Sequence, residues 1–440
     1  MVREQWTRSG FLLAGIGSAA GLGNIWRFSY VAGENGGAAF LIIYLLAVIL
    51  IGLPLVIAEL AIGSKGRGDA VATLRHEAPT GHWYFAGGLS VIGAFFILGF
   101  YSVIAGWALK YFIGAADGSL WASQQLNAYT SYFEAFIARP FEPLGWQLLM
   151  IALTTAVVAG GIRHGIEAAN RLLMPLLCLI VIGLAAYSLS LDGAEKGLDF
   201  LFSPDWSAFT RPAVYIAAIG QAFFSLGIGM AIFLTYGSYL NPKQSIKKSA
   251  SIIVLGDSLL AITAGLAIFP AVFAFGIDPA QGPELAFITL PGLFAQLPGG
   301  RIIGTLFFGL LAGAALTSMF SILEVPSAYL ARRLSCSRRK ATALAAGLSF
   351  IAGIPPALGF GVFEQVTIGG QNLLDSYDDG VSHLLLPTGG ILIALFTGWG
   401  WGKSRAIEAA GLGNSKLGSF WLFSLKYIGP VVILTVFIAV

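Results

Sequence analysis

The sequence predicts an all-α membrane protein with eleven transmembrane helices. Of its 440 residues, 57% are hydrophobic and only 11% are charged, whereas a soluble domain carries about 25% charged residues. The apolar runs are continuous and about twenty residues long, which is the length that a helix needs to cross a bilayer core of about 30 Å. The strands of a membrane barrel would instead alternate in polarity over about ten residues. We therefore expect the lipid bilayer to surround most of the chain.

The apolar runs place the expected helices in chain order. The spans cover about residues 10–32, 38–62, 85–113, 146–160, 168–190, 213–239, 248–276, 300–330, 340–359, 380–401 and 419–439. The loop 277–299 holds two short apolar stretches with prolines between them. We expect this loop to form a structured hairpin that packs into an outer vestibule.

Basic residues indicate the orientation of the chain. With the N-terminus in the cytoplasm, eighteen of the 25 Lys and Arg residues fall in cytoplasmic segments, as the positive-inside rule favours. The odd number of spans then leaves the C-terminus outside. The net charge of +3 is explained by this topology, so it does not indicate a nucleic-acid partner.

The first span carries an unusual density of glycine. Its stretch GIGSAAGLGNIWRF, Gly15 to Phe28, has the spacing G-x-G-x-x-x-G-x-G. A dinucleotide-binding loop is excluded, because such a loop needs a preceding strand inside a soluble βαβ unit. Close packing between membrane helices remains an alternative for Gly15 and Gly17, since small residues let such helices approach one another.

The sixth span repeats the pattern. In GQAFFSLGIGMAIF, Gly227 and Gly229 flank one residue, just as Gly21 and Gly23 flank Leu22. The two spans are five apart, which predicts a five-plus-five inverted repeat with broken first and sixth helices and a binding site between them. Irregular backbone at membrane depth is tolerable where it lines a cavity or contacts a ligand. We expect one transporter domain over residues 1–440, with repeats at about 8–190 and 212–401 and an extra helix at about 419–439.

Several motifs in this order resemble the neurotransmitter:sodium symporter family, in particular its bacterial amino-acid transporters. They are GLGNIWRFSYVAGENGGAAF, IGLPLVIAELAIG, YSVIAGW, GQAFFSLGIGM, LTSMFSILEVPSAYL and LLDSYDD, and together they extend over nearly the whole chain. The resemblance implies sodium-driven uptake of an amino acid by alternating access in a plasma membrane, here a bacterial inner membrane. It implies no enzymatic activity.

The resemblance also implies two sodium sites. The first would use the carbonyl of Ala19, the side chains of Asn24 and Asp257, and the carbonyl and hydroxyl of Ser225, completed by the substrate carboxylate. The second would use the carbonyls of Gly17, Ala20 and Ala314 and the hydroxyls of Thr317 and Ser318. The alternative for these two hydroxyls is a bond to the preceding turn of their own helix.

The implied substrate site lies between the two helix breaks. The substrate carboxylate would bind the amides of Leu22 and Gly23 and the hydroxyl of Tyr101, and the ammonium would face carbonyls of Ala19, Phe224 and Ser225. Its side chain would be enclosed by Ile97, Tyr101, Phe224, Met230, Ser318 and Ile322. Monoamine carriers of the family bear an aspartate where this chain has Gly21, which leaves room for a substrate that brings its own carboxylate. Gly227 adds further room, so we expect a neutral, hydrophobic or aromatic amino acid. For Met230 and Ile322, ordinary core packing is the alternative.

The resemblance places gates on both sides of the site. Outside, Arg27 and Asp378 match a gate pair, although Asp375 and Asp379 are neighbours of Asp378. Inside, Arg3, Trp6 and Tyr239 match a latch whose acidic partner is replaced here by Arg332. Gly165 and Pro175 match a glycine–proline pair at which some bacterial relatives unwind the fifth helix, and a chance pair is the alternative.

The buried carboxylates leave further alternatives open. Glu59 and Glu324 are either protonated structural groups or participants in proton counter-movement. Asp257 stands where chloride-dependent relatives have asparagine, so the resemblance implies chloride-independent transport, unless Asp257 is a protonated core residue. The alternatives in function are symport of another small zwitterion, an ion channel built from broken helices, and a transport-dead sensor.

Overall fold

The computed structural model describes residues 4–78, 81–122, 126–280, 285–413 and 415–439, and this part of the chain is mainly helical, with no β-strand. The helices are α1 (Arg8–Ala19), α2 (Phe28–Glu34), α3 (Ala38–Ala47), α4 (Leu53–Gly66), α5 (Ala70–Glu77), α6 (Tyr84–Asp117), α7 (Leu126–Ile137), α8 (Glu142–Ala159), α9 (Ala168–Leu189), α10 (Ala194–Phe202), α11 (Pro212–Leu226), α12 (Ile232–Ser238), α13 (Ile246–Ala274), α14 (Thr289–Gln296), α15 (Gly300–Arg333), α16 (Arg338–Ala357), α17 (Leu373–Asp379), α18 (Leu386–Leu395), α19 (Lys403–Ala409), α20 (Lys416–Phe423) and α21 (Gly429–Ala439).

Short π-helical turns join several of these helices into longer rods. One such turn continues α3 into α4 and another continues α17 into α18, so that two of the rods run over Ala38–Gly66 and Leu373–Gly400. Within the described residues, eight rods are long and apolar enough to cross a membrane. The first and sixth spans are broken into shorter helices, and the ninth span is α16. Together with the eight rods, these three account for the eleven predicted spans. The all-helical membrane fold predicted from the sequence is confirmed.

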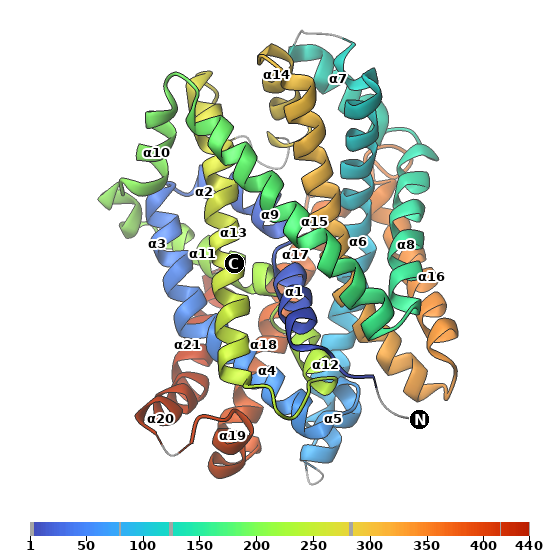
Figure 1. Cartoon of the computed structure of the whole chain (residues 1–440), viewed down its shortest axis with the longest axis vertical. Coiled ribbons are helices and arrows are strands. Elements are labelled where there is room, and N and C mark those ends of the chain that lie inside the picture. Colours follow the sequence, from blue (N-terminus) through green and yellow to red (C-terminus); the bar gives the residue numbers. More distant parts are fainter. Residues whose placement is uncertain (1–3, 79–80, 123–125, 281–284, 414, 440) are drawn as a thin grey trace.

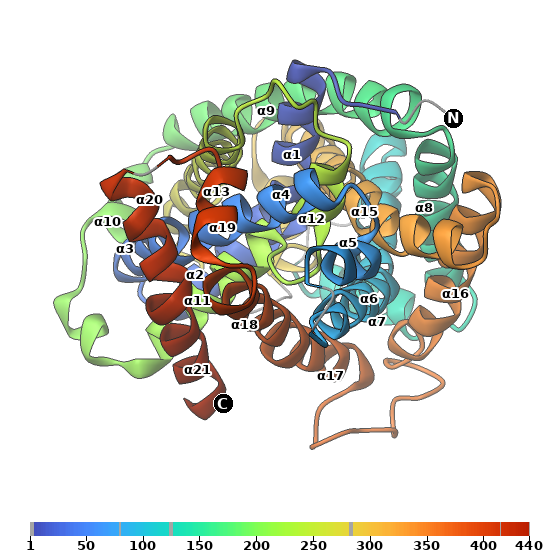
Figure 2. The ribbon, with the colours of Figure 1, turned by 90° about the horizontal axis from the view of Figure 1, so that it is seen from below.

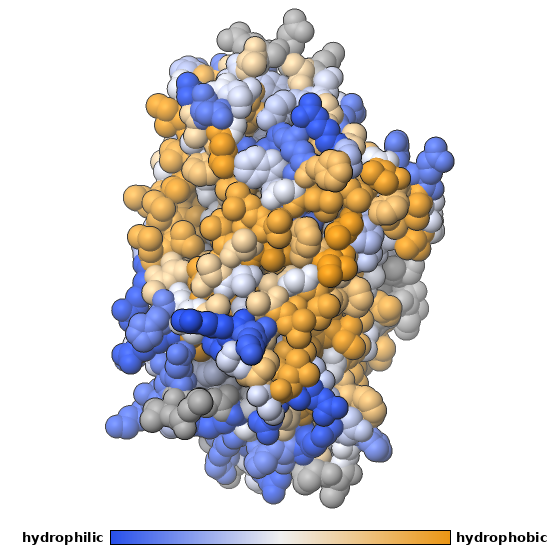
Figure 3. All heavy atoms as spheres, turned by 90° about the vertical axis from the view of Figure 1, so that its right-hand side faces the viewer, coloured by the Kyte–Doolittle hydropathy of each residue, from blue (hydrophilic) through white to orange (hydrophobic). Residues whose placement is uncertain are grey.

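The outer surface matches a membrane environment. Figure 3 shows an apolar band across the middle of one face, with hydrophilic residues gathered at both ends. Many large apolar side chains are exposed on the outward faces of the long helices, among them Leu172, Leu179, Ile302 and Ile351. In water this exposure would be costly, but beside lipid tails it is favourable.

The short helices α1 and α12 lie inside the bundle. Figure 1 shows α1 at mid-height and α12 in the lower half of the molecule, and Figure 2 shows α12 near the middle when seen from below. Helix α1 packs against α9, α13 and α15. The longest pair, α6 and α15, pack along each other, and α12 packs on α4. The broken spans therefore sit where the protein is most enclosed.

Each break has a local cause in the sequence. The first span stops at Ala19 and resumes in a π-helical turn at Gly23. The sixth stops at Leu226, after which Gly227 and Gly229 adopt φ of +64° and +86°. Such left-handed backbone is easy for glycine and strained for other residues. The glycines that the sequence singled out therefore lie at both breaks.

The predicted spans differ from the observed ones mainly at their ends. The tenth helix begins at Leu373, seven residues before the predicted 380, because Asn372 caps its first turn by accepting a hydrogen bond from the Asp375 amide at 3.0 Å. In the loop 277–299, residues 281–284 lie outside the described residues. The part that follows forms α14, and Phe287 stacks with Phe133 of α7 at 5.7 Å between ring centroids. The hairpin in an outer vestibule stays a prediction.

Candidate functional site

The two helix breaks enclose a small cavity. Its volume is about 20 Å³, and it is lined by Ser18, Ala19, Gly21, Gly23, Ile97, Tyr101, Phe224, Ser225, Gly227, Met230, Ile232, Ser318 and Ile322. None of these residues carries a charge. The sequence-based site contained all of them except Ser18 and Ile232, which lie inside the two glycine-rich stretches but were not assigned to the cavity.

The backbone of Leu22, the remaining predicted residue, reaches the cavity through a hydrogen bond. Its amide donates to the hydroxyl of Tyr101 at 2.9 Å, so the two groups expected to hold a carboxylate lie side by side. A Cβ at Gly21 would lie 2.1 Å from the Ser318 hydroxyl oxygen and 2.7 Å from that of Tyr101. Only glycine leaves these two hydroxyls room at this position.

A polar cluster lies beside the cavity, at the residues predicted for the first sodium ion. The Ser225 hydroxyl is 2.8 Å from Asn24 Oδ1 and 2.8 Å from Asp257 Oδ1. Asn24 Nδ2 donates to the same carboxylate at 2.7 Å, and the Tyr44 hydroxyl donates to its other oxygen at 3.2 Å. All four side chains are buried. Ala19, whose carbonyl was predicted as a further ligand, lines the adjoining cavity.

This cluster concentrates oxygen atoms around one carboxylate. Hydroxyl, amide and carboxylate oxygens are the ligands that hard cations take in proteins. A carboxylate buried in a membrane protein is costly unless it is paired or hydrogen-bonded, and here the hydrogen bonds come from neutral groups only. The donor set is therefore of the kind that suits a hard cation, and the first sodium site stays a prediction.

The residues predicted for the second sodium ion lie where α1 meets α15. The Ser318 hydroxyl donates to the carbonyl of Ser18 at 3.0 Å and lies 3.5 Å from that of Gly17. Thr317 donates to the carbonyl of Ala314 at 2.9 Å within its own helix, which is the alternative that the sequence left open for it. Ala20 closes the last turn of α1 by bonding the Ile16 carbonyl at 2.7 Å. The structure therefore brings Ser318 to the end of α1, while it pairs Thr317 with Ala314 inside α15.

Glu59 has a contact that the sequence did not assign. Its carboxylate is fully buried and accepts hydrogen bonds from the amides of Gly229 at 3.1 Å and Leu234 at 3.4 Å. It therefore satisfies donors that the break in the sixth span leaves without helical partners, as an unwound membrane segment requires. The glycine pattern located the break, but no local signal connected it to a carboxylate about 170 residues earlier.

Arg27 and Asp378 are the residues predicted for the outer gate. Arg27 donates to Gln221 Oε1 at 3.1 Å, and its guanidinium carbon lies 4.7 Å from the centre of the Phe224 ring. Asp378 accepts a hydrogen bond from Ser382 at 2.7 Å. Arg27 and Asp378 line one hollow of about 320 Å³ together with Asp375 and Asp379. Among the described residues, Arg27 contacts Gln221 and Phe224 rather than its predicted acidic partner.

Trp6, which is predicted for the inner latch, is 2% exposed. Its ring nitrogen donates to the Tyr236 carbonyl at 3.1 Å, and its amide donates to the Tyr239 carbonyl at 3.2 Å. The Tyr239 hydroxyl in turn donates to Glu324 at 2.9 Å, and Glu324 is paired with Arg338. This chain from α12 to α15 and α16 contains the acidic partner of Tyr239.

Arg332, which replaces the expected acid of the inner latch, has a different contact. Its Nε atom lies 3.6 Å from Asp69 Oδ2. Arg3, the remaining latch prediction, lies outside the described residues. The predicted unwinding pair is part of one continuous helical rod: Gly165 lies in the π-helical turn before α9, and Pro175 lies inside α9. A Cβ at Gly165 would lie 1.9 Å from the Val157 carbonyl oxygen, so close packing also requires this glycine.

Comparison with known proteins shows what the whole chain is similar to. The model of the sodium:neurotransmitter symporter family matches residues 3–136 and 137–440. The sodium-dependent transporter YhdH of Bacillus subtilis is 41% identical over 442 residues, covering 99% of this chain and 97% of its own. A sodium-dependent transporter of Haemophilus influenzae is 32% identical over 448 residues, covering 99% of this chain and 98% of its own.

A solved structure agrees with the fold. The crystal structure of MhsT in complex with L-phenylalanine superposes with a TM-score of 0.94 at 49% sequence identity and covers 99% of both chains. Similarity of this extent shows that the two chains share one overall fold.

Proposed function

The chain belongs to the sodium:neurotransmitter symporter family, and from that premise we propose that it imports a neutral, hydrophobic or aromatic amino acid together with sodium. One observation carries the proposal. The cavity between the two breaks has no charged lining residue, and it brings the Leu22 amide and the Tyr101 hydroxyl together where Gly21 leaves space. A zwitterion that supplies its own charges is the ligand that fits.

The amino-acid backbone is held by main-chain groups in this proposal. Amides at the start of a half-helix favour a carboxylate, and free carbonyls at the end of one favour an ammonium group. The side chain then meets Ile97, Phe224, Met230 and Ile322, with Gly227 leaving additional space. The solved relative MhsT was crystallised with L-phenylalanine, which supports an apolar or aromatic side chain here.

Two sodium ions accompany the substrate in this proposal. The first is held by Asn24, Ser225 and Asp257 together with carbonyl oxygens and the substrate carboxylate. The second is held between Gly17, Ala20 and Ala314 and the hydroxyls of Thr317 and Ser318. Because the carboxylate belongs to both the substrate and the first sodium site, binding of each raises the affinity for the other by the same factor.

The orientation and the gates complete the proposal. The N-terminus lies in the cytoplasm and the C-terminus outside, in the inner membrane of a bacterium. Residues 1–440 act as one transporter domain, in which the spans up to about residue 190 and those from about 212 to 401 form the two repeats. Arg27 and Phe224 close the outer side, and Trp6 and Tyr239 close the inner side. Alternate opening of these two closures exposes the same site to each side in turn.

Uptake into proteoliposomes tests the proposal. Purified protein is reconstituted, and uptake of labelled phenylalanine, leucine and tryptophan is followed under an inward sodium gradient and under a matched potassium gradient. We expect saturable accumulation in sodium only, and we expect at least one of the three amino acids to compete with the others.

The outcomes separate the proposed symporter from its alternatives. Equal affinity for the amino acid in sodium and in potassium would contradict the shared carboxylate. Sodium-dependent binding without accumulation or counterflow would identify a sensor, and a current that does not saturate with substrate would identify a channel. Accumulation of another zwitterion, with none of the three amino acids competing, would refute the substrate class alone.

A further inference from the structure

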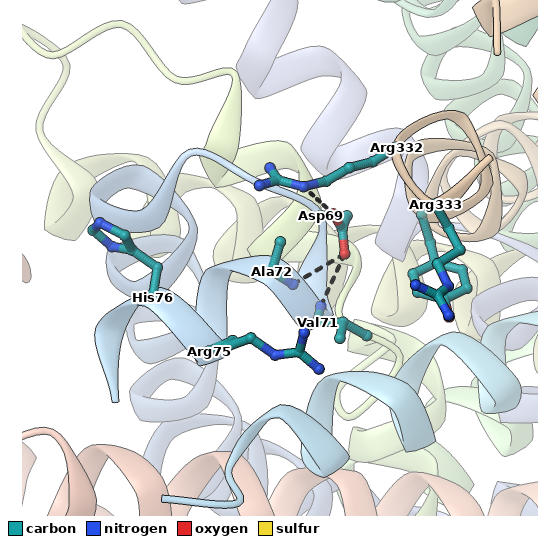
Figure 4. Close-up of a pocket in the computed structure, with 8 residues that line it drawn as sticks. Asp69, Val71, Ala72, Arg75, His76, Arg332 and Arg333 are labelled. Atoms are coloured by element: carbon teal, nitrogen blue, oxygen red, sulfur yellow. Dashed lines mark hydrogen bonds and ion pairs between the residues drawn. The ribbon is translucent and has the colours of Figure 1, made fainter. Parts of the chain in front are cut away.

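A second hollow, distant in sequence from the helix breaks, lies at the end of the molecule that carries α5. It has a volume of about 400 Å³ and is lined by Asp69, Val71, Ala72, Arg75, His76, Tyr329, Arg332 and Arg333. Figure 4 shows Arg75 from α5 and Arg332 and Arg333 from α15 on different sides of Asp69, with His76 turned away from them. Two helices far apart in sequence thus converge their cationic side chains on one space.

The acidic groups at this hollow are already engaged. Asp69 caps α5 by accepting hydrogen bonds from the amides of Val71 and Ala72, both at 3.1 Å, and it lies 3.6 Å from Arg332. Glu77, the acid next to His76, lies 3.2 Å from that ring and accepts a hydrogen bond from Trp401 at 2.9 Å. The acids therefore compensate Arg332 and His76.

Arg75 and Arg333 remain uncompensated. Within the described residues neither forms an ion pair, although both line the hollow. The guanidinium of Arg75 lies 4.6 Å from the centre of the Tyr84 ring, a cation–π contact that holds the side chain in place while leaving its N–H groups free. An arginine fork held in this way suits the oxygen atoms of a phosphate group.

The surroundings of the hollow are those of a membrane boundary. Tyr84 begins α6 and Arg333 ends α15, and both helices are among the predicted membrane spans. Phe85, next in the chain to Tyr84, is 64% exposed, and Leu334, next to Arg333, is 52% exposed. An apolar chain could lie against these side chains while its anionic end occupies the hollow.

We propose that this hollow, between α5 and the end of α15, is a binding site for a phosphate group, with Arg75 and Arg333 as its principal ligands and Arg332 as a third. The phosphate group is that of an anionic phospholipid headgroup or of a soluble phosphate. In either case two phosphate oxygens bind guanidinium groups from two helices, so that the ligand bridges α5 and α15. This site is independent of the amino-acid and sodium sites.

The test uses two probes on the purified full-length protein. Binding of phosphatidylglycerol is measured by native mass spectrometry against phosphatidylcholine with the same acyl chains. Binding of inorganic phosphate is measured by thermal stabilisation against chloride at equal ionic strength. The pocket variant is Arg75→Gln with Arg333→Gln. The matched control is Lys403→Gln with Arg405→Gln, which removes the same charge from the exposed residues of α19.

We expect the pocket variant to bind its probe at least about tenfold more weakly than the wild type, since each arginine near an anionic headgroup contributes about fivefold in affinity. The control should leave binding close to that of the wild type, because Lys403 and Arg405 do not line the hollow. Preference for phosphatidylglycerol identifies a lipid headgroup, and stabilisation by inorganic phosphate identifies a soluble phosphate.

Two results would overturn the proposal. In the first, the wild type prefers neither probe over its reference compound. In the second, the pocket variant and the control variant lose affinity equally, so that binding reflects only the general positive charge of this face. If the pocket variant does not fold, Arg333→Gln with Arg75→Lys is used instead. It keeps the positive charge beside Tyr84 but loses the planar guanidinium group. Either of the two results named above, obtained with this variant, would overturn the proposal.

Discussion

The Leu22 amide donates a hydrogen bond of 2.9 Å to the Tyr101 hydroxyl across the central cavity. One partner belongs to the break in the first span and the other to the continuous helix α6, so the contact joins the irregular backbone to a rigid element. In the proposed function both groups turn to the substrate carboxylate. The hydrogen bond therefore marks the position that the carboxylate takes.

Tyr101→Phe tests this position. A hydrogen bond to a charged group contributes about 1.5–3 kcal/mol, so we expect sodium-dependent amino-acid binding to weaken by about ten- to a hundredfold. The measurement is the affinity for labelled phenylalanine in sodium. Tyr111→Phe is the matched control, because Tyr111 is also buried on α6 and its hydroxyl has no hydrogen-bond partner within the described residues. Similar losses in both variants would count against a specific contact.

Gly21→Ala tests the space beside that position. The added Cβ would lie 2.1 Å from Ser318 Oγ and 2.7 Å from the Tyr101 hydroxyl, so it would push both hydroxyls out of place. We expect amino-acid binding to be lost while the protein still folds. Gly88→Ala is the control, since nothing lies within 4 Å of a Cβ there. Unchanged binding in Gly21→Ala would show that the ligand does not need this space.

Thr317→Ala with Ser318→Ala tests the second sodium site. The double variant removes two proposed hydroxyl ligands, so sodium-driven uptake should be abolished at normal expression. If these hydroxyls only bond neighbouring carbonyls, as Thr317 does with Ala314 at 2.9 Å, uptake should survive. Thr397→Ala is the matched control, because Thr397 is buried and bonds the Ile393 carbonyl of its own helix at 2.8 Å. Uptake near the wild-type level in the double variant would refute the site.

Arg338→Met tests the inner closure. Glu324 is fully buried and is paired with Arg338 and Tyr239. Removing the arginine leaves a buried carboxylate without its cation, which costs about 3–5 kcal/mol. We expect a lower melting temperature and faster alkylation of a Ser18→Cys thiol from the cytoplasmic side. Arg339→Met, at the exposed neighbouring position, is the control. Equal melting temperatures and equal alkylation rates for the two variants would contradict this role of the pair.

The sequence predicted the helices and the breaks because both follow from local composition. Apolar runs give membrane helices, and Gly227 and Gly229 allow the left-handed backbone that ends α11. Contacts between distant segments carried no such signal. The pairing of Glu324 with Arg338 and that of Glu59 with Gly229 depend on how the helices pack. The sequence therefore did not identify Glu324 as the acid that contacts Tyr239 in place of the one that Arg332 replaces.

The motifs that resemble a known family located the cavity more completely than periodicity could. They named most of the lining residues and the cluster around Asp257, while they omitted Ser18 and Ile232. The expected contact of Arg27 with Asp378 depends on the conformation as well as on the sequence. In this structure Arg27 lies over Phe224 and donates a hydrogen bond to Gln221. It lines the same hollow as Asp378 but forms no ion pair with it among the described residues.

The last prediction concerns Asp257 and chloride. The resemblance matches Asp257 to an asparagine of chloride-dependent relatives, and in this structure Ser225, Asn24 and Tyr44 donate to its carboxylate at distances of 2.7 to 3.2 Å. All of these donors are neutral, so the negative charge of Asp257 is available to balance a sodium ion. A cation without such balance inside a buried site would cost several kcal/mol.

We therefore expect the wild type to transport equally well in chloride and in gluconate. Asp257→Asn removes the fixed charge but keeps the size of the side chain, so its uptake in gluconate should fall steeply. Chloride should restore part of that uptake, because a mobile anion can take the place of the carboxylate beside Tyr44 and Ser225. The measurement is the initial rate of sodium-driven uptake in each anion, with the wild type in both anions as the control. If Asp257 is instead a protonated core residue, the asparagine side chain should replace it without loss. Chloride should then make no difference to uptake by the wild type or by the Asp257→Asn variant. A wild type that requires chloride, or an asparagine variant that transports normally in gluconate, would assign the charge balance to another group.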